Sequence, residues 1–451
     1  MKRNSERLYL LSNEKVSKAL LKLGVPTMIG MMTSALYNLV DAYFVGQLGT
    51  SQIGAVSVVF PIGVILLGVG LLFGSGASSY LARLLGNKQF KEADECASTA
   101  VGASMVTAIL IILAMLQFLN PFLKVLGATD SIMPYAKEYA VWFLIGLIFN
   151  VFNITVNNII TAEGATSYSM IAMLTGGVVN VILDPIFIFK LDLGVKGAAF
   201  ATLLSRFIVF CIYMYYILRG RSNFHFSIKN FRLQRKVFAE IFKIGIPMLV
   251  YQLLCSLALS LTNSQAAKYG DEAVAAIGVV NRILSLGAMM IMGFLKGYQP
   301  FVGYNYAAGN QARVKEATKT ALLWTTIFCI SVAVLFIGLK RPLIQAFIRT
   351  DSNVLRIGQK TLVMNLLTFI GMGYQMVYST MFMGLGKAKE GGMISIGRQG
   401  MFFIPILLIA AKISGLNGII AAQPLADICS MILVFYLVHR KASGKLLQVD
   451  R

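Results

Sequence analysis

The stretch Asn180-Val-Ile-Leu-Asp184-Pro185 lies inside an apolar run from about residue 168 to residue 189. A carboxylate within a hydrocarbon-spanning segment is energetically unfavourable, so an intramembrane acid indicates a functional site. Asn180 precedes Asp184 by four residues, which places both side chains on one helix face. Pro185 lacks an N–H and clashes with the carbonyl of Val181. These features favour a cation or proton site on a bent helix; the alternative is a buried acid with a structural partner.

The composition predicts an all-α polytopic membrane protein. The chain has 451 residues, of which 57% are hydrophobic and 13% charged, and its mean hydropathy is +0.73. A soluble protein would carry about 25% charged residues. Apolar runs of about 20 residues, the length that crosses a bilayer, recur along the chain. We count twelve, centred near residues 33, 66, 106, 145, 178, 207, 251, 286, 326, 370, 401 and 428.

The net charge of +21 does not indicate nucleic-acid binding, because the basic residues lie between apolar runs rather than on one soluble face. With twelve spans both termini share one side of the membrane. The loops on that side hold most of the lysines and arginines, above all between Arg219 and Lys236. This excess predicts cytoplasmic termini, although the basic loop from Lys340 to Arg356 is a local exception.

Cysteine and histidine usage argues against an enzyme or a metal centre. The five cysteines are scattered and lie mostly in apolar runs, so they form neither a disulfide framework nor a metal cluster. His225 and His439 lie in a basic loop and in the C-terminal tail. The first apolar run contains Asn38 and Asp41 and lacks a small-residue cleavage pattern, so we interpret it as a span rather than a signal peptide.

The two halves of the chain repeat one another at a spacing of about 221 residues. The matched landmarks are Leu21-Lys-Leu-Gly-Val-Pro26 with Phe242-Lys-Ile-Gly-Ile-Pro247, Gly86-Asn87 with Gly309-Asn310, Thr129-Asp130 with Thr350-Asp351, and Gly194-Val-Lys-Gly197 with Gly415-Leu-Asn-Gly418. Six spans per repeat predict parallel repeats, which are typical of transporters. We expect a six-helix lobe over residues 1–218, a cytoplasmic linker over 219–237, a second lobe over 238–440 and a tail over 441–451.

Four polar residues of the first half are predicted to lie at one depth. Asp41 lies near the outer end of the first span, Asn180 and Asp184 near that of the fifth, and Thr202 near the outer start of the sixth. One shared polar site explains their common depth better than four unrelated polar residues would. Tyr37 and Asn38 border it on the first span, and Asn153 and Asn157 on the fourth. A polar stripe in lipid often joins helices, so the asparagines favour neither interpretation.

The second half does not copy the acids. At the repeat spacing Asp41 corresponds to Thr262, and Asp184-Pro185 to Ile404-Pro405. The second lobe has charged residues of its own, and at the repeat spacing Arg206 of the first lobe corresponds to Asp427. These charges, which we interpret first as structural ion pairs or helix-end charges, are Arg206, Arg282, Lys296, Arg398 and Asp427. The competing hypothesis makes Asp427 a second coupling site with Lys296 as its counter-ion.

Two six-span repeats, the Gly-x-Pro entry to the first and seventh spans, Asp41, and the Leu183-Asp184-Pro185 run together resemble the MATE (multidrug and toxic compound extrusion) family, in particular its bacterial MepA-like and DinF-like branch. The resemblance covers nearly the whole chain. It implies a V-shaped two-lobed antiporter of the bacterial plasma membrane that exchanges cationic amphipathic compounds for H⁺ or Na⁺. It also maps a coupling site onto Asp41, Asn180, Asp184 and Thr202. Some branches instead use acids in the seventh and tenth spans, which hold none here.

The residues leave the coupling ion open. Two carboxylates in a medium of low dielectric constant repel each other when both are ionised, so such a pair binds a proton or Na⁺. We expect no cofactor, no nucleic-acid partner and a monomer in the lipid bilayer. A flippase for lipid-linked precursors remains the main alternative, supported by Arg206, Arg282, Lys296 and Arg398. An intramembrane aspartyl protease using Asp41 and Asp184 is remote, because neither acid has the Gly-x-Gly-Asp context.

Overall fold

The computed structural model describes residues 5–347 and 352–442, and every regular element in these ranges is a helix. The first half contains α1 (Ser5–Ser12), α2 (Val16–Gly46), α3 (Thr50–Gly86), α4 (Phe90–Gln117), α5 (Leu119–Val125), α6 (Met133–Ala162), α7 (Thr166–Pro185), the π-helical turn η1 (Ile186–Lys190) and α8 (Gly194–Leu218). In lipid a helix satisfies its backbone polar groups within the segment, which explains why these apolar runs are helical.

The second half repeats this order. It contains the 3₁₀ turn η2 (Ile228–Asn230), α9 (Arg235–Ala267), α10 (Asp271–Ala307), α11 (Gln311–Gly338), α12 (Lys340–Gln345), α13 (Ser352–Gly384), α14 (Ala388–Ile396), the π-helical turn η3 (Gly397–Phe402) and α15 (Phe403–Ala442). The segment between α8 and α9 covers residues 219–234. Of the expected landmarks, Thr350-Asp351 and the tail from residue 443 onward lie outside the described residues.

The expected twelve spans are confirmed. Among residues 5–347 and 352–442, ten stretches qualify by length and hydropathy as membrane-crossing helices. The last of them, Ala388–His439, contains two spans because the chain reverses at Gly415. The 33-residue helix α13 supplies the remaining span. All twelve spans are therefore helical, and the short helices α5 and α12 follow the third span of each half.

The Gly-x-x-Gly landmark has a structural cause in both halves. Gly194 and Gly415 adopt left-handed φ values of 52° and 58°, which let the chain reverse between its fifth and sixth spans in each repeat. Gly197 and Gly418 then pass close to the preceding span. A Cβ at Gly418 would lie 1.9 Å from the Ala410 carbonyl oxygen, so only glycine permits this contact.

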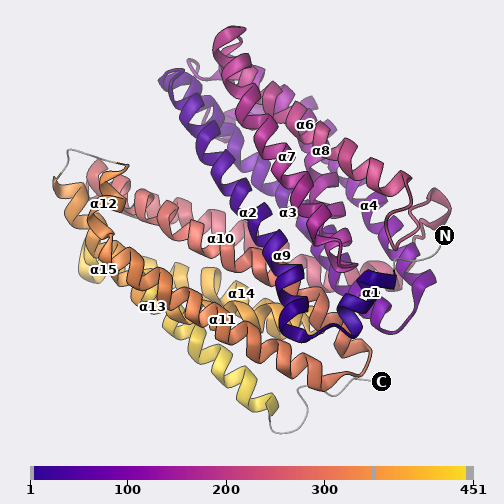
Figure 1. Cartoon of the computed structure of the whole chain (residues 1–451). Coiled ribbons are helices and arrows are strands. Elements are labelled where there is room, and N and C mark those ends of the chain that lie inside the picture. Colours follow the sequence, from indigo (N-terminus) through magenta and orange to yellow (C-terminus); the bar gives the residue numbers. More distant parts are fainter. Residues whose placement is uncertain (1–4, 348–351, 443–451) are drawn as a thin grey trace.

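The helices form two groups that meet at one end of the molecule and diverge toward the other (Figure 1). One group comprises α2–α8 and the other α9–α15. We call the end that carries α1 and residues 219–234 the linker end. Between the groups, α2 packs on α10 and α3 packs on α9. The arrangement is a V of two six-span lobes.

Glycines bring the two lobes into backbone contact near the linker end. A Cβ at Gly245 would lie 2.1 Å from the Leu72 carbonyl oxygen, and one at Gly76 would lie 2.2 Å from that of Ile241. A Cβ at Gly297 would lie 2.4 Å from the Leu23 carbonyl. Small residues allow this close approach of membrane helices. The Gly-x-Pro landmark therefore has its cause in the joint between the lobes.

Helix α1 crosses beneath both lobes at the linker end. Arg7 forms an ion pair with the fully buried Glu163 at 3.2 Å. Tyr216 and the Asn223 backbone N–H also donate to this carboxylate. Burial raises the pKa of Glu163, against the Arg7 charge and these hydrogen bonds, which lower it.

On the side of the second lobe, Asn305 donates to the Leu11 carbonyl at 3.0 Å and Arg313 to that of Glu14 at 2.8 Å. Together with the Arg7 contacts, these bonds attach the N-terminal segment to both lobes.

The joint predicts opposite effects for two glycines of α10. Gly297→Ala should destabilise the protein by about 1–3 kcal/mol, because the added methyl group overlaps the α2 backbone. Gly278 has no atom within 4 Å of an added Cβ, so Gly278→Ala should be neutral or slightly stabilising through helix propensity. Thermal unfolding midpoints of the purified variants measure both effects. Equal midpoints for the two variants would contradict a joint of direct backbone contact.

Candidate functional site

Asp41 of α2 and Asp184 of α7 lie together in the first lobe, with their carboxyl groups within hydrogen-bonding range of each other. Asp184 is fully buried and Asp41 is partly buried. The Asn180 amide donates to Asp184 Oδ1 at 3.2 Å, as the one-turn spacing predicts. Pro185 ends α7, and the chain continues as the π-helical turn η1. The sequence therefore brings two acids from distant spans to one place.

Three oxygens of this group are buried without a hydrogen-bond partner among the described residues: Asp41 Oδ1, Asn180 Oδ1 and Asp184 Oδ2. Buried polar atoms normally find a partner, so these oxygens are free to bind an ion or a proton. A hydrogen bond between two carboxyl groups requires a proton on one of them. Oxygen donors alone are also the ligands of hard cations. The donor set fits either a proton or Na⁺.

Arg206 of α8 lies beside the acids, and its charge attracts Asp41. Its guanidinium carbon is 5.0 Å from the centroid of the Phe143 ring, and its Nη1 is buried without a partner among the described residues. Two carboxylates and one guanidinium carry a net charge of −1. One monovalent cation is therefore enough to neutralise the group.

Two tyrosines complete the surroundings of Arg206. Tyr37 and Tyr139 both lie close enough to act on its charge. Tyr37, expected at the edge of the site, packs against Gly177 of α7, where an added Cβ would lie 3.3 Å from its ring. Tyr139 was not among the residues predicted from the sequence. Its depth near the outer start of the fourth span, opposite Asp41, was the signal available.

Thr202 and Asn38 were also expected near the acids, and the structure places them differently from each other. Thr202 is partly buried one turn before Arg206, and its carbonyl accepts from Ser205 at 2.9 Å. Asn38 is exposed, and its amide donates to the carbonyl of Ser34 at 2.7 Å on its own helix. The Asn38 amide is therefore bonded within its own helix and not to the acid pair.

Asn153 and Asn157 of α6 join helices. The Asn153 amide donates to the Arg206 carbonyl at 2.8 Å, next to the acid site. Asn157 donates to the Tyr213 hydroxyl at 2.7 Å and accepts from Lys296 of the other lobe. Asn157 thus belongs to a contact between the lobes.

The hypothesis that Lys296 is the counter-ion of Asp427 is wrong. Lys296 reaches Asn157 of the first lobe, whereas Asp427 pairs with Arg398 at 2.7 Å. Gln423 donates to the same carboxylate at 2.9 Å, and Gln375 donates to the Asp427 carbonyl at 2.8 Å. The pair is largely buried and mutually neutralised, as expected for a structural ion pair.

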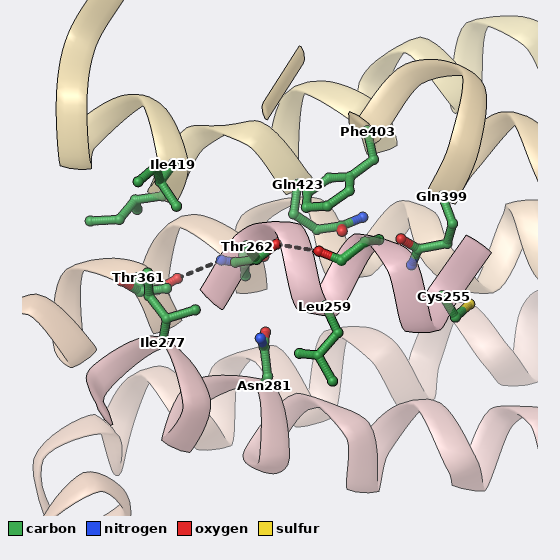
Figure 2. Close-up of a pocket in the computed structure, with 13 residues that line it drawn as sticks. Cys255, Leu259, Thr262, Ile277, Asn281, Thr361, Gln399, Phe403, Ile419 and Gln423 are labelled. Carbon is green, nitrogen blue, oxygen red and sulfur yellow. Dashed lines mark hydrogen bonds between the residues drawn. The ribbon is translucent and has the colours of Figure 1, made fainter. Parts of the chain in front are cut away.

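A cavity of about 230 Å³ occupies the second lobe at the place equivalent to the acid site (Figure 2). Thr262, the repeat counterpart of Asp41, and Gln423, that of Thr202, both line it. The lining includes no charged side chain. The two lobes thus place different chemistry at equivalent positions.

The MatE family model matches residues 26–186 and 247–409, one block in each repeat. The chain belongs to this family. The Staphylococcus aureus (strain NCTC 8325 / PS 47) protein named multidrug export protein MepA is 30% identical over 447 residues, covering 96% of this chain and 97% of that protein. The MepA of Staphylococcus haemolyticus is 28% identical over 436 residues, covering 96% of each chain.

Solved MATE structures share the whole fold. An outward-facing multidrug resistance MATE transporter superposes with a TM-score of 0.93 at 27% identity, covering 98% of this chain and 99% of that one. A Pyrococcus furiosus transporter of the MOP superfamily, described as having a binding pocket of reversed polarity, gives a TM-score of 0.91 at 27% identity with the same coverage. The chain is accordingly a multi-pass membrane transporter of the MATE family.

The Arg398–Asp427 pair predicts a stability effect that differs from that of a surface pair. Asp427→Ala should destabilise the protein by about 3–5 kcal/mol, because it leaves Arg398 buried and unpaired. The double variant Arg398→Leu/Asp427→Leu should recover much of this loss. As a control, Glu92→Ala breaks the exposed pair with Lys236 and should change stability by about 1 kcal/mol or less. Thermal unfolding midpoints of the three purified variants measure these effects. A double variant that is less stable than Asp427→Ala would contradict a purely structural role of the pair.

Proposed function

We propose that the protein is a multidrug-export antiporter that expels small cationic amphipathic compounds in exchange for H⁺ or Na⁺, with coupling at Asp41 and Asp184. The observation that carries the proposal is the paired acids with three orphaned oxygens in a family of transporters. The two relatives named as multidrug export proteins support the substrate class. No cofactor is needed, because the ion gradient supplies the free energy.

The charge of the site supports exchange of one coupling cation per cycle. Asp41, Asp184 and Arg206 together carry −1 when all are ionised. A bound proton or Na⁺ brings this to zero, which favours a buried group in a medium of low dielectric constant. Asn180 supplies a further oxygen, and Thr202 lies one turn before Arg206 on α8. Release of the ion restores the negative charge.

Helix α2 offers a path from the site to the joint between the lobes. Asp41 lies near one end of α2, and Gly24, which packs against Phe294 of α10, lies near the other. Pro26 interrupts the backbone bonding between them. We infer that loading the acid pair shifts α2 and the bend at Pro185 together. The shift changes which side of the V is open.

The topology follows from the basic loops. We place the linker end, both termini and the linker in the cytoplasm, and the open side of the V outside a bacterial plasma membrane. The lobes then extend to about residues 218 and 440, and the linker, expected over 219–237, ends at residue 234 because α9 begins at Arg235. We expect the protein to work as a monomer, because the acid site lies within one lobe and the joint between the lobes is internal.

Neutralising either acid should abolish export. Asp184→Asn and Asp41→Asn keep the side-chain shape but remove the charge that binds the coupling ion, so ethidium accumulation in an efflux-deficient host should match that of cells lacking the protein. The matched control is Asp192→Asn, an exposed acid in the turn after η1, which should export normally. Size-exclusion profiles establish that the variants are folded.

Transport measurements in membrane vesicles then identify the coupling ion. Ethidium efflux is measured with the Na⁺ gradient and the pH gradient imposed separately, and only one should drive it. Normal coupled export by a folded Asp184→Asn variant would contradict the proposal. Failure of the wild-type protein to export ethidium would do the same.

A further inference from the structure

The cavity of the second lobe is a polar site without charge. Residues from α9, α10, α13, η3 and α15 surround it. Its polar side chains are Thr262, Asn281, Thr361, Asn365, Gln399 and Gln423. Figure 2 shows Asn281 extending from α10 toward the space in front of Thr262 and Gln423. The mouth is bordered by Asn281 and Leu259, which are both exposed.

The hydrogen bonds within the wall show what the cavity offers. Asn365 donates to the Thr361 carbonyl at 2.9 Å and Gln423 to Asp427 at 2.9 Å, so an N–H of each amide is used while its oxygen remains available. Thr262 donates to the Ala258 carbonyl at 2.8 Å. The amides of Asn281 and Gln399 make no hydrogen bond with any residue in the described ranges. The cavity therefore offers mainly acceptors, together with two free amides.

The surroundings of the cavity lack a net charge. The Arg398–Asp427 pair lies directly behind Gln399 and Gln423, and its two charges cancel at 2.7 Å. The electrostatic attraction for a cation is therefore weak in this cavity, whereas the acid site of the first lobe attracts cations. The amides of Asn281, which is exposed, and Gln399, which is partly buried, are free to bind a ligand that both donates and accepts hydrogen bonds.

The size restricts the ligand further. Sites that enclose a drug-sized molecule have about 300–1,000 Å³. At about 230 Å³ the cavity holds the polar end of such a molecule, while Leu259 at the mouth contacts an apolar remainder.

We propose that this cavity binds the uncharged polar end of amphipathic compounds that carry hydroxyl or amide groups, giving the transporter a second substrate class. The inference rests on the proposed export function but adds a class that the acid pair does not recognise. Asn281 and Gln399 bind the polar end, and the neighbouring oxygens of Asn365 and Gln423 accept its donors.

Chloramphenicol, which is uncharged and carries an amide and two hydroxyl groups, is the probe. Asn281→Leu and Gln399→Leu should each weaken its binding and export about 2- to 10-fold, the effect of one lost hydrogen bond. Ethidium export should stay unchanged in both variants. Ser285→Leu, at an exposed position one turn along α10 outside the cavity lining, is the matched control and should affect neither compound.

Two readouts separate failure of this inference from failure of the export function. Cells report export of chloramphenicol and ethidium side by side, and the purified full-length chain reports chloramphenicol binding through the thermal midpoint. Loss of ethidium export in both leucine variants would indicate that they misfold. The milder substitution Asn281→Ser, at an exposed position, would then replace them in the test of chloramphenicol export. Wild-type protein that neither binds nor exports chloramphenicol would overturn the inference. So would equal losses for both compounds in a folded variant.

Discussion

The repulsion between two carboxylates at one buried place is the constraint on which the other features depend. Asp41 and Asp184 come from different spans and meet beside Arg206, which removes one of their two charges. The remaining negative charge is unfavourable in a medium of low dielectric constant until a cation neutralises it. In the proposed function, the group is therefore more stable with a cation bound than when it is empty. The proposed antiport needs this difference, because the conformation must depend on which species is bound.

In the proposed mechanism, the joint between the lobes converts that difference in stability into a change of conformation. At Gly76, Gly245 and Gly297 the backbones of the two lobes are in direct contact. The lobes therefore meet at the linker end without long, flexible side chains between them. Closely packed interfaces switch between discrete arrangements rather than deforming continuously. Helix α2 takes part in both the joint and the acid site. Lys296, which crosses from α10 to Asn157, adds a polar contact that must break if the lobes separate.

The repeat and the spans could be predicted from the sequence because both are periodic signals: apolar runs of bilayer length, and glycine and proline landmarks at a fixed spacing. Asp41, Asn180 and Asp184 could be placed at one depth for the same reason. Partners across helices could not be predicted, since depth does not fix rotation about a helix axis. Asn38 thus bonds within its own helix, Arg206 lies beside Asp41, and Lys296 reaches Asn157 rather than Asp427. Tyr139 was missed because a tyrosine near a span end is common.

The central claim is that Asp41 and Asp184 form one ion site, and a double-variant comparison tests it most directly. The thermal midpoint of the purified protein is measured with Na⁺ against choline, and at acidic against alkaline pH, for the wild type, Asp41→Asn, Asp184→Asn and the double variant. A ligand that binds only the folded state raises the midpoint. The account predicts that one ion stabilises the wild type and that each single variant loses the same increment as the double variant. Losses that differ between the acids, or that add in the double variant, would contradict it.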